Sequence, residues 1–248
     1  MGTDRQGQWQ WWARWCVAVI GAVSLTAGAR LGWAASEGER KLTDEVVAVV
    51  HKLQARYEKT KDLQAGFAQK TKIEGFATPI VSSGRFHIKR PGRLRWDYLE
   101  PTHEEIYVNH DDVKMYVPEH QQVLVGKLTQ MSASQAPLQL LQGIAKIEAE
   151  FDVSPVNGGA RGAGGLPLIA LVPKGGEAQA PRPYQQIVLE VDPKTSYIKT
   201  LTLHELSGNV STFEFLDVKA NAGVRDALFE FTVPPGVEVV RAPTFHAP

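Results

Sequence analysis

The sequence predicts an α+β fold in which a long antiparallel sheet of about 10 to 11 strands is covered on one face by two or three helices. From residue 62 onwards, most segments alternate apolar and polar residues, which is typical of strands with one buried face. Short turn-forming segments separate these strands, as in a meander. Two apolar segments with helical spacing, at residues 43–59 and 136–146, supply the helices.

The first 35 residues differ from the rest of the chain. Basic residues precede a short apolar run at residues 15–23, and small residues follow it. This order is typical of a secretory signal peptide, and the run is too short to span a bilayer comfortably. We therefore expect cleavage after Ala29 or near Ala35 and Ser36, which leaves a single domain at residues 36–248.

Composition limits the function classes. The chain has 248 residues and equal numbers of basic and acidic side chains, 27 of each, so a nucleic-acid partner is not expected. Cys16, the only cysteine, lies in the signal segment, so the mature protein has no disulfide. No nucleophile motif and no metal-ligand spacing of histidines appear. We expect no enzyme, no metal and no cofactor.

The first helix is expected to begin at Thr43, whose hydroxyl suits an N-cap. Its apolar side chains recur at spacings of three and four over about 17 residues. They are Val46, Val50, Leu53 and Tyr57. Such a stripe must cover an apolar surface, and the sheet that follows is the candidate.

The most regular strands lie within residues 82–101 and turn back at Pro91-Gly92. One face of this hairpin is apolar, while Arg90 at its edge has the parity of that apolar face. A charge there costs several kcal/mol unless it is hydrogen-bonded. Arg90 either extends its head into water at the strand end or donates hydrogen bonds to whatever covers the apolar face.

The other strands continue the alternation, with one interruption. A short apolar helix at residues 136–146 has Pro137 in its first turn and Gly143 near its end. Its pattern fits a lid element and a packed crossover helix equally well. A sheet this long rolls up to protect its edges. The remaining strands are expected at residues 62–72, 105–109, 113–117, 121–125, 147–153, 166–172, 186–191, 198–206, 210–218 and within 228–240.

Several segments, taken in order along the chain, resemble a known family. They are the Leu63…Phe67-Ala68-Gln69 pattern, Lys89-Arg90-Pro91, Arg95-Trp96-Asp97-Tyr98 with Glu100-Pro101, Met115-Tyr116-Val117-Pro118-Glu119 with Gln121-Gln122-Val123, Pro137-Leu138-Gln139-Leu140-Leu141, and the ending Phe229 to Val237. The ordered set is similar to the LolA family of periplasmic lipoprotein carriers from about residue 42 to about residue 240. No single segment is specific, whereas the ordered set is.

The resemblance implies an incomplete antiparallel β-barrel with a helical lid over an apolar cavity for the acyl chains of lipoproteins. It implies a monomeric periplasmic chaperone that takes lipoproteins from an inner-membrane ABC transporter and passes them to an outer-membrane receptor. It also implies that Arg90 is a gating latch to the lid helix near Leu141 and Gln142. The residues expected to line the cavity and lid are Phe67, Phe86, Ile88, Leu94, Trp96, Tyr98, Leu138 and Leu141.

Two other functions fit the same half-barrel. A regulatory module that senses lipid or lipoprotein would form a stable partner complex and no soluble lipoprotein intermediate. A carrier of another lipid would co-purify with phospholipid or glycolipid. The sequence alone does not distinguish these two functions from lipoprotein transport.

Overall fold

The structure, a computed structural model, describes residues 37–128, 138, 140, 141, 147–174 and 184–241. The chain divides into two compact units, residues 1–34 and 35–248, and every described residue belongs to the second. The expected signal segment with its cleavage sites, Gln142 and most of the expected helix at 136–146 lie outside the described residues. No helix in the described part of the chain is long and apolar enough to cross a membrane.

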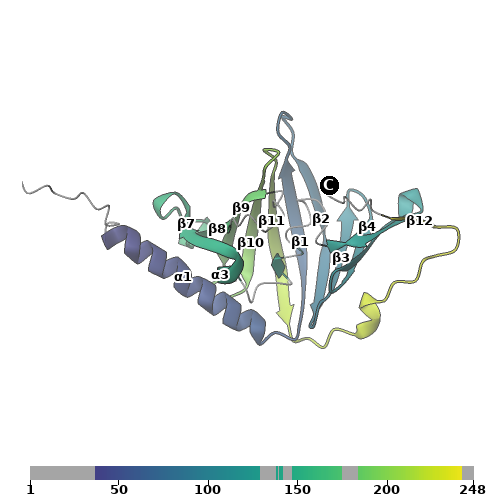
Figure 1. The fold of residues 1–248 in the computed structure, drawn as a ribbon, viewed down its shortest axis with the longest axis horizontal. Coiled ribbons are helices and arrows are strands. Elements are labelled where there is room, and N and C mark those ends of the chain that lie inside the picture. Colours follow the sequence, from purple (N-terminus) through teal and green to yellow (C-terminus); the bar gives the residue numbers. More distant parts are fainter. Residues whose placement is uncertain (1–36, 129–137, 139, 142–146, 175–183, 242–248) are drawn as a thin grey trace, which may run out of the picture. The chain divides into compact units, whose positions relative to one another are not determined.

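The strands of the described residues form one sheet (Figure 1). They are β1 (Asp62–Lys72), β2 (Ile80–Lys89), β3 (Arg93–Glu100), β4 (Glu104–Asn109), β5 (Asp112–Val117), β6 (Gln122–Lys127), β7 (Phe151–Pro155), β8 (Leu168–Pro173), β9 (Tyr184–Val191), β10 (Ile198–Glu205), β11 (Val210–Ala220) and β12 (Glu238–Arg241). Their spatial order is β12-β6-β5-β4-β3-β2-β1-β11-β10-β9-β8-β7, so β12 and β7 are its edges.

The pairing confirms the expected incomplete barrel and adds one detail to it. The sheet has 12 strands, slightly more than expected, and it remains open. All neighbouring strands pair antiparallel except β12, which pairs parallel with β6. Because consecutive strands are mostly neighbours, short turns are enough to connect them.

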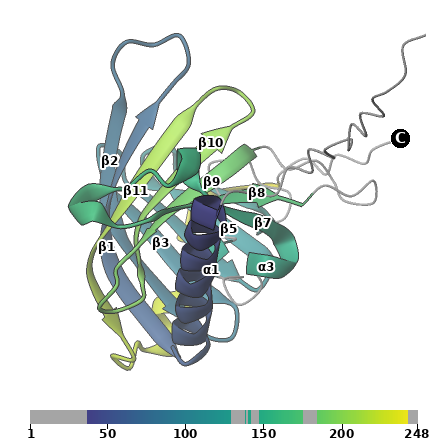
Figure 2. The same cartoon turned by 90° about the vertical axis from the view of Figure 1, so that its left-hand side faces the viewer.

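The first helix, α1 (Glu37–Glu58), lies across one face of the sheet (Figure 2). The expected N-cap at Thr43 is wrong, because this residue lies inside the helix and its hydroxyl donates to the carbonyl of Glu39 at 2.9 Å. The preceding residues, Glu37 to Lys41, are mostly strong helix formers and extend the helix upstream. A second, short helix, α3 (Ile147–Glu150), replaces the first half of the strand expected at 147–153.

One hydrophobic core lies between α1 and the face of the sheet that it covers, which we call the inner face. The predicted stripe of Val46, Val50, Leu53 and Tyr57 is buried in this core. The Tyr57 ring meets the Tyr197 ring edge-on with centroids 5.2 Å apart. Burying four such side chains contributes several kcal/mol, which holds α1 on the sheet.

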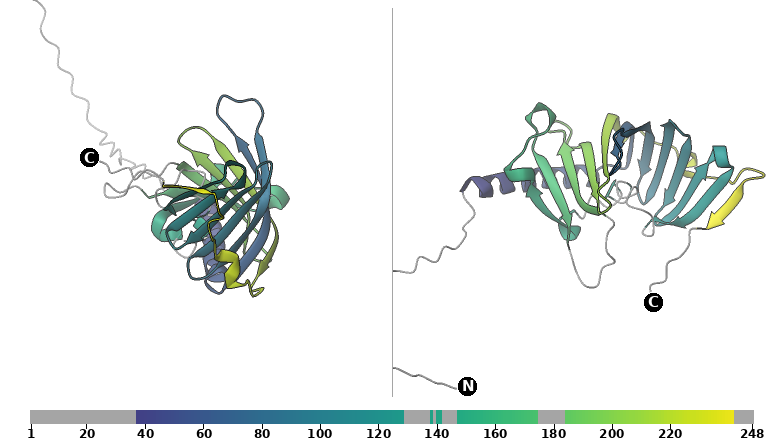
Figure 3. Two further views of the ribbon diagram at one scale, coloured as in Figure 1. Left: turned by 90° about the vertical axis from the view of Figure 1, so that its right-hand side faces the viewer. Right: turned by 90° about the horizontal axis from the view of Figure 1, so that it is seen from above.

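The C-terminal segment, residues 224–241, crosses the outer face of the sheet (Figure 3). A 3-10 helix, η7 (Asp226–Phe229), lies against β3 and β4. The strand expected within 228–240 is short, because only Glu238–Arg241 pairs, as β12. Two prolines, Pro234 and Pro235, lack the N–H group that a strand needs and delay the pairing.

Candidate functional site

The inner face carries a cluster of six aromatic side chains, which we call the aromatic floor. Trp96 lies at its centre and is 1% exposed. Its ring centroid is 4.3 Å from that of Phe67, 5.1 Å from Phe86 and 5.9 Å from Phe213. Such spacings favour offset and edge-on contacts between aromatic rings. The floor consists of Phe67, Phe86, Trp96, Tyr98, Phe213 and Phe215.

Strand register explains how the floor is assembled. Phe67 in β1 is opposite Gly84 in β2, and Gly84 is opposite Tyr98 in β3. With no side chain at Gly84, the Phe67 ring lies over the backbone there and reaches both Trp96 and Tyr98. A Cβ atom at this position would lie 2.7 Å from Cζ of Phe67, too close for any real contact. The floor therefore depends on glycine at this one position.

The structure brings the sequence-predicted cavity and lid residues together in one core cluster, with Tyr98 packed against its edge. Leu138 and Leu141, from the expected lid, are helical and are 2% and 1% exposed. The buried members are Phe67, Phe86, Ile88, Leu94, Trp96, Leu138 and Leu141. Because these side chains are almost fully enclosed, a ligand reaches them only after the side chains packed over them move.

Two floor residues were missed in the sequence. Phe213 and Phe215 in β11 lie beside β1, although β1 and β11 are far apart in the chain. Their alternation with Thr212, Glu214 and Leu216 predicts one apolar face. Alternation does not reveal the neighbouring strand, so nothing in the local pattern places these two residues beside Trp96.

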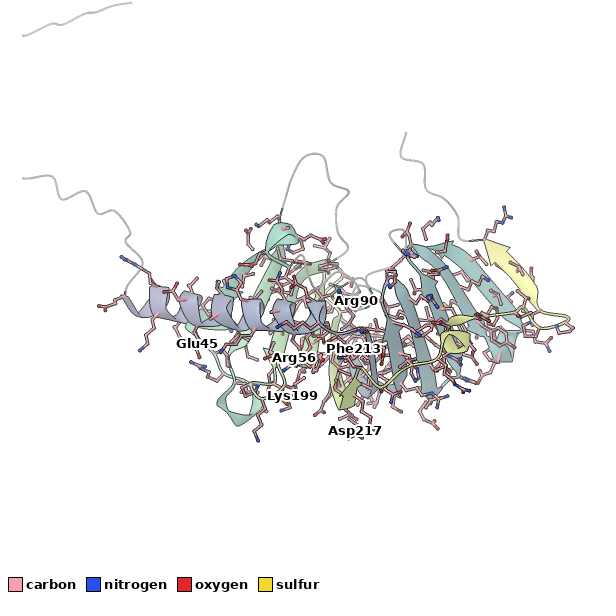
Figure 4. The ribbon with its side chains drawn as sticks, turned by 90° about the horizontal axis from the view of Figure 1, so that it is seen from below. Glu45, Arg56, Arg90, Lys199, Phe213 and Asp217 are labelled. Carbon is pink, nitrogen blue, oxygen red and sulfur yellow. The ribbon has the colours of Figure 1, made fainter. Side chains whose placement is uncertain are left out.

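Arg90 lies at one end of the inner face, beside the C-terminal end of α1 (Figure 4). Its Nη2 atom is buried and has no hydrogen-bond partner among the described residues. Burial raises the pKa of the nearby Tyr57 hydroxyl, and the positive charge of Arg90 partly offsets this effect. Within the described residues, no hydrogen bond joins the Arg90 side chain to Leu141. The latch therefore stays a prediction.

The opposite end of the inner face is polar. The Tyr98 hydroxyl donates to Oε1 of Gln69 at 2.9 Å, and Nε2 of Gln69 donates to the Thr71 hydroxyl at 3.0 Å. Glu104 in β4 is directly opposite Tyr98. Burial raises the pKa of the Glu104 carboxyl. The inner face thus has a cation at one end, an aromatic floor in the middle and a carboxyl group at the other end.

The outer face of β3 is less open to water than the alternation suggested. Asp97 is 1% exposed and forms ion pairs with Arg95 at 2.8 Å and Arg85 at 3.3 Å. Arg95 also lies over the Tyr107 ring at 4.9 Å from its centroid. An enclosed carboxylate is tolerated because two guanidinium groups neutralise it.

The C-terminal segment is attached to this outer face. Asp226 forms ion pairs with Lys89 at 2.8 Å and Arg93 at 2.7 Å. The hydrogen bond from Lys89 holds the pKa of the Asp226 carboxyl below its ordinary value. Phe231 contacts the Tyr107 ring with centroids 4.9 Å apart. A pocket of about 470 Å³ lies between this segment and strands β4 to β6.

Comparison with known proteins establishes the family. The family model described as "Outer membrane lipoprotein carrier protein LolA" matches residues 58–232. The chain belongs to the LolA family. This match covers most of the sheet together with the aromatic floor, and it confirms the resemblance seen in the sequence.

Individual relatives agree with this assignment. An outer-membrane lipoprotein carrier protein of Methylobacillus flagellatus is 28% identical over 192 residues, 77% of this chain and 88% of the relative. A protein of the same name from Pseudomonas paraeruginosa is 29% identical over 208 residues, 78% of this chain and 88% of the relative. An uncharacterized conserved protein of Thermus thermophilus shares the fold, with a TM-score of 0.51 and 12% identity over 80% of this chain and 99% of that one.

Proposed function

We propose that this LolA-family protein is a periplasmic chaperone that binds the acyl chains of lipoproteins and carries them to the outer membrane. The observation that supports this best is the aromatic floor, an extended apolar surface covered by helices on an open sheet. The names of the relatives, which are lipoprotein carriers, point to the same cargo. In this proposal, residues 1–35 direct secretion and residues 36–248 form the monomeric carrier. An inner-membrane ABC transporter supplies the cargo and an outer-membrane receptor accepts it.

The physics of acyl chains explains why such a carrier needs a cover. Burying one chain of about 16 carbons gains on the order of 10 kcal/mol, at about 0.8 kcal/mol per CH2 group. Binding is therefore favourable, and release is the difficult step. A cover that closes over the empty floor competes with the cargo for the same apolar surface. This competition lowers the net affinity and assists release.

Arg90 is the proposed latch of this cover. Its buried Nη2 lacks a partner among the described residues, which is costly for a charged group, so a nearby carbonyl of the cover is a favourable acceptor. We expect Arg90→Leu to accept lipoprotein and to transfer it poorly, because the empty state loses the bond that competes with cargo. Arg85→Leu, on the outer face, is the control for charge loss. Normal transfer by Arg90→Leu would refute the latch.

The carrier function is tested by incubating the secreted protein with energised spheroplasts. We expect a lipoprotein to leave the membrane in a soluble one-to-one complex. Phe215→Ser should reduce this release because Phe215 belongs to the floor. Leu216→Ser is the matched control, because the neighbouring side chain is 42% exposed on the other side of β11. No release by a folded protein, with the transporter active, would contradict the proposal and favour a sensor or a carrier of another lipid.

A further inference from the structure

Glu104 is a carboxyl group on the inner face that forms no ion pair with any described residue. Ile106 and Val108 in the same strand are buried in the core, so alternation places Glu104 on the inner face with them. Glu105 points to the outer face, where it lies 3.3 Å from Arg95. Neighbouring glutamates on one strand thus have different surroundings, and only Glu105 has a cation beside it.

No basic side chain of the adjoining strands neutralises Glu104. The described structure gives its carboxylate no hydrogen bond and no ion pair, while burial raises the pKa of the group. Arg90, which has the parity of the inner face, lies at the other end of β3. The lysines and arginines within β1 to β5 alternate onto the outer face, and they are Lys70, Lys72, Arg85, Lys89, Arg93, Arg95 and Lys114.

A buried donor without an acceptor lies at the centre of the floor, in the same strand as Tyr98. Nε1 of Trp96 has no hydrogen-bond partner in the described part of the chain, although Trp96 is 1% exposed. Burial raises the pKa of the Tyr98 hydroxyl, and the nearby Trp96 N–H group partly offsets this effect. The Trp96 N–H group nevertheless lies outside hydrogen-bond geometry with Tyr98. A buried donor without a partner costs free energy, which a ligand with a suitable acceptor recovers. The Glu104 carboxyl is half-buried and has no cation beside it among the described residues, so a ligand cation is a favourable partner.

We propose that Glu104, with Tyr98 and Gln69 beside it, binds the free ammonium group on the acylated N-terminal cysteine of a lipoprotein. This inference rests on the proposed carrier function and adds a substrate class to it, namely lipoproteins whose amino group is not acylated. The acyl chains lie along the aromatic floor, and the ester carbonyls of the glyceryl group come within reach of the Trp96 N–H. The polar end of the inner face then holds the head of the cargo, and Arg90 stands at the opposite end.

The chemistry of the two cargo classes explains the selectivity. A free ammonium group donates three hydrogen bonds and carries a charge that matches the carboxylate. The rings of Tyr98, Phe67 and Trp96 add cation–π attraction, because their faces are electronegative. Acylation of the amine leaves a neutral amide, so Glu104 would gain no counter-charge from the cargo. Losing one charge-assisted contact of this kind corresponds to about tenfold weaker binding.

The test compares two synthetic dipalmitoyl-glyceryl-cysteinyl peptides that differ only in whether the amine is free or acetylated. Binding is measured by fluorescence anisotropy at about pH 6.5, where an α-amino group is charged. We expect wild-type protein to bind the free-amine peptide about tenfold more tightly. Glu104→Gln should bind both peptides about equally, because a neutral amide offers no counter-charge. Glu119→Gln, an exposed charge loss elsewhere, should behave as wild type.

The outcomes separate this inference from the carrier function. Equal binding of both peptides by wild-type protein would overturn the inference alone, as would a preference that Glu104→Gln retains. Binding of neither peptide by the folded wild-type protein would overturn the carrier function, and the inference with it. The wild-type comparison does not depend on whether the variant folds.

Discussion

Replacing Gly84 with alanine should damage the fold at the aromatic floor. An added Cβ atom would lie 2.0 Å from the Asp97 carbonyl oxygen and 2.7 and 2.8 Å from two ring atoms of Phe67. Extending the first of these contacts to 3.0 Å needs a shift of 1.0 Å in a hydrogen-bonded strand. The ring cannot yield freely, because it already contacts Trp96 at 4.3 Å between centroids.

The expected cost follows from these contacts. Overfilling a packed site costs about 1–3 kcal/mol. Displacing Phe67 also weakens its aromatic contacts, which are worth about 0.5–1.5 kcal/mol each. We therefore expect Gly84→Ala to lower the free energy of unfolding by about 3 kcal/mol. Urea denaturation followed by circular dichroism measures this change.

Gly66→Ala is the matched control in the adjacent strand. A Cβ atom there would meet no atom closer than 3.7 Å, which is ordinary van der Waals contact. We expect its stability to be equal to or slightly above that of the wild type, by up to about 1 kcal/mol, because alanine restricts the unfolded chain. A Gly84→Ala loss no larger than that of Gly66→Ala would refute the proposed close fit of Phe67 over Gly84.

Three further changes test the outer face. Asp97→Asn should cost about 3 kcal/mol in urea unfolding, because it removes the buried charge that pairs with both Arg85 and Arg95 and leaves Arg95 with Glu105 alone, whereas Arg85→Ala, at an exposed partner, should cost under about 1 kcal/mol; similar losses would contradict this picture. Asp226→Asn should speed hydrogen exchange of residues 224–231, more at low than at high salt, and unchanged exchange would disprove the attachment. Burial lowers the pKa of His87, so its protonation destabilises the folded state: the full free energy of unfolding is present above the ordinary pKa near 6.5 and is lost as the pH falls. His87→Gln should therefore flatten the plot of unfolding free energy against pH, measured with urea, between about pH 7 and pH 5. Parallel plots for the variant and the wild type would exclude His87 as the cause.

The sequence predicted the parts of the fold that depend on local pattern. Alternation from Phe86 to Tyr98 correctly placed Trp96 on the apolar face, because side chains of a strand alternate whatever its partner is. The stripe from Val46 to Tyr57 was correct for the same reason, with helical spacing. The start of α1 was missed because a threonine with acidic residues after it fits a cap and a helix interior equally well.

The parts that were missed depend on contacts between distant segments. Nothing in residues 238–241 shows that β12 pairs parallel with β6, since one strand can pair in either direction. The burial of Asp97 was also missed, because alternation assigns a face but not what lies over that face. The same limit applies to Glu104, whose lack of a cation partner became visible only when the basic side chains of the neighbouring strands were placed.

The open edge between β7 and β12 has a mechanical consequence. A closed barrel has a fixed number of strands and a fixed tilt, so its interior widens only if hydrogen bonds between strands break. In this sheet, β7 and β12 are the two ends of the strand order and do not pair with each other. The half from β12 to β1 and the half from β11 to β7 can therefore move apart at the open edge while every strand keeps its hydrogen-bonded neighbours. The width of the interior is then set by elastic twisting of the sheet, and chains of different bulk can be accommodated without partial unfolding.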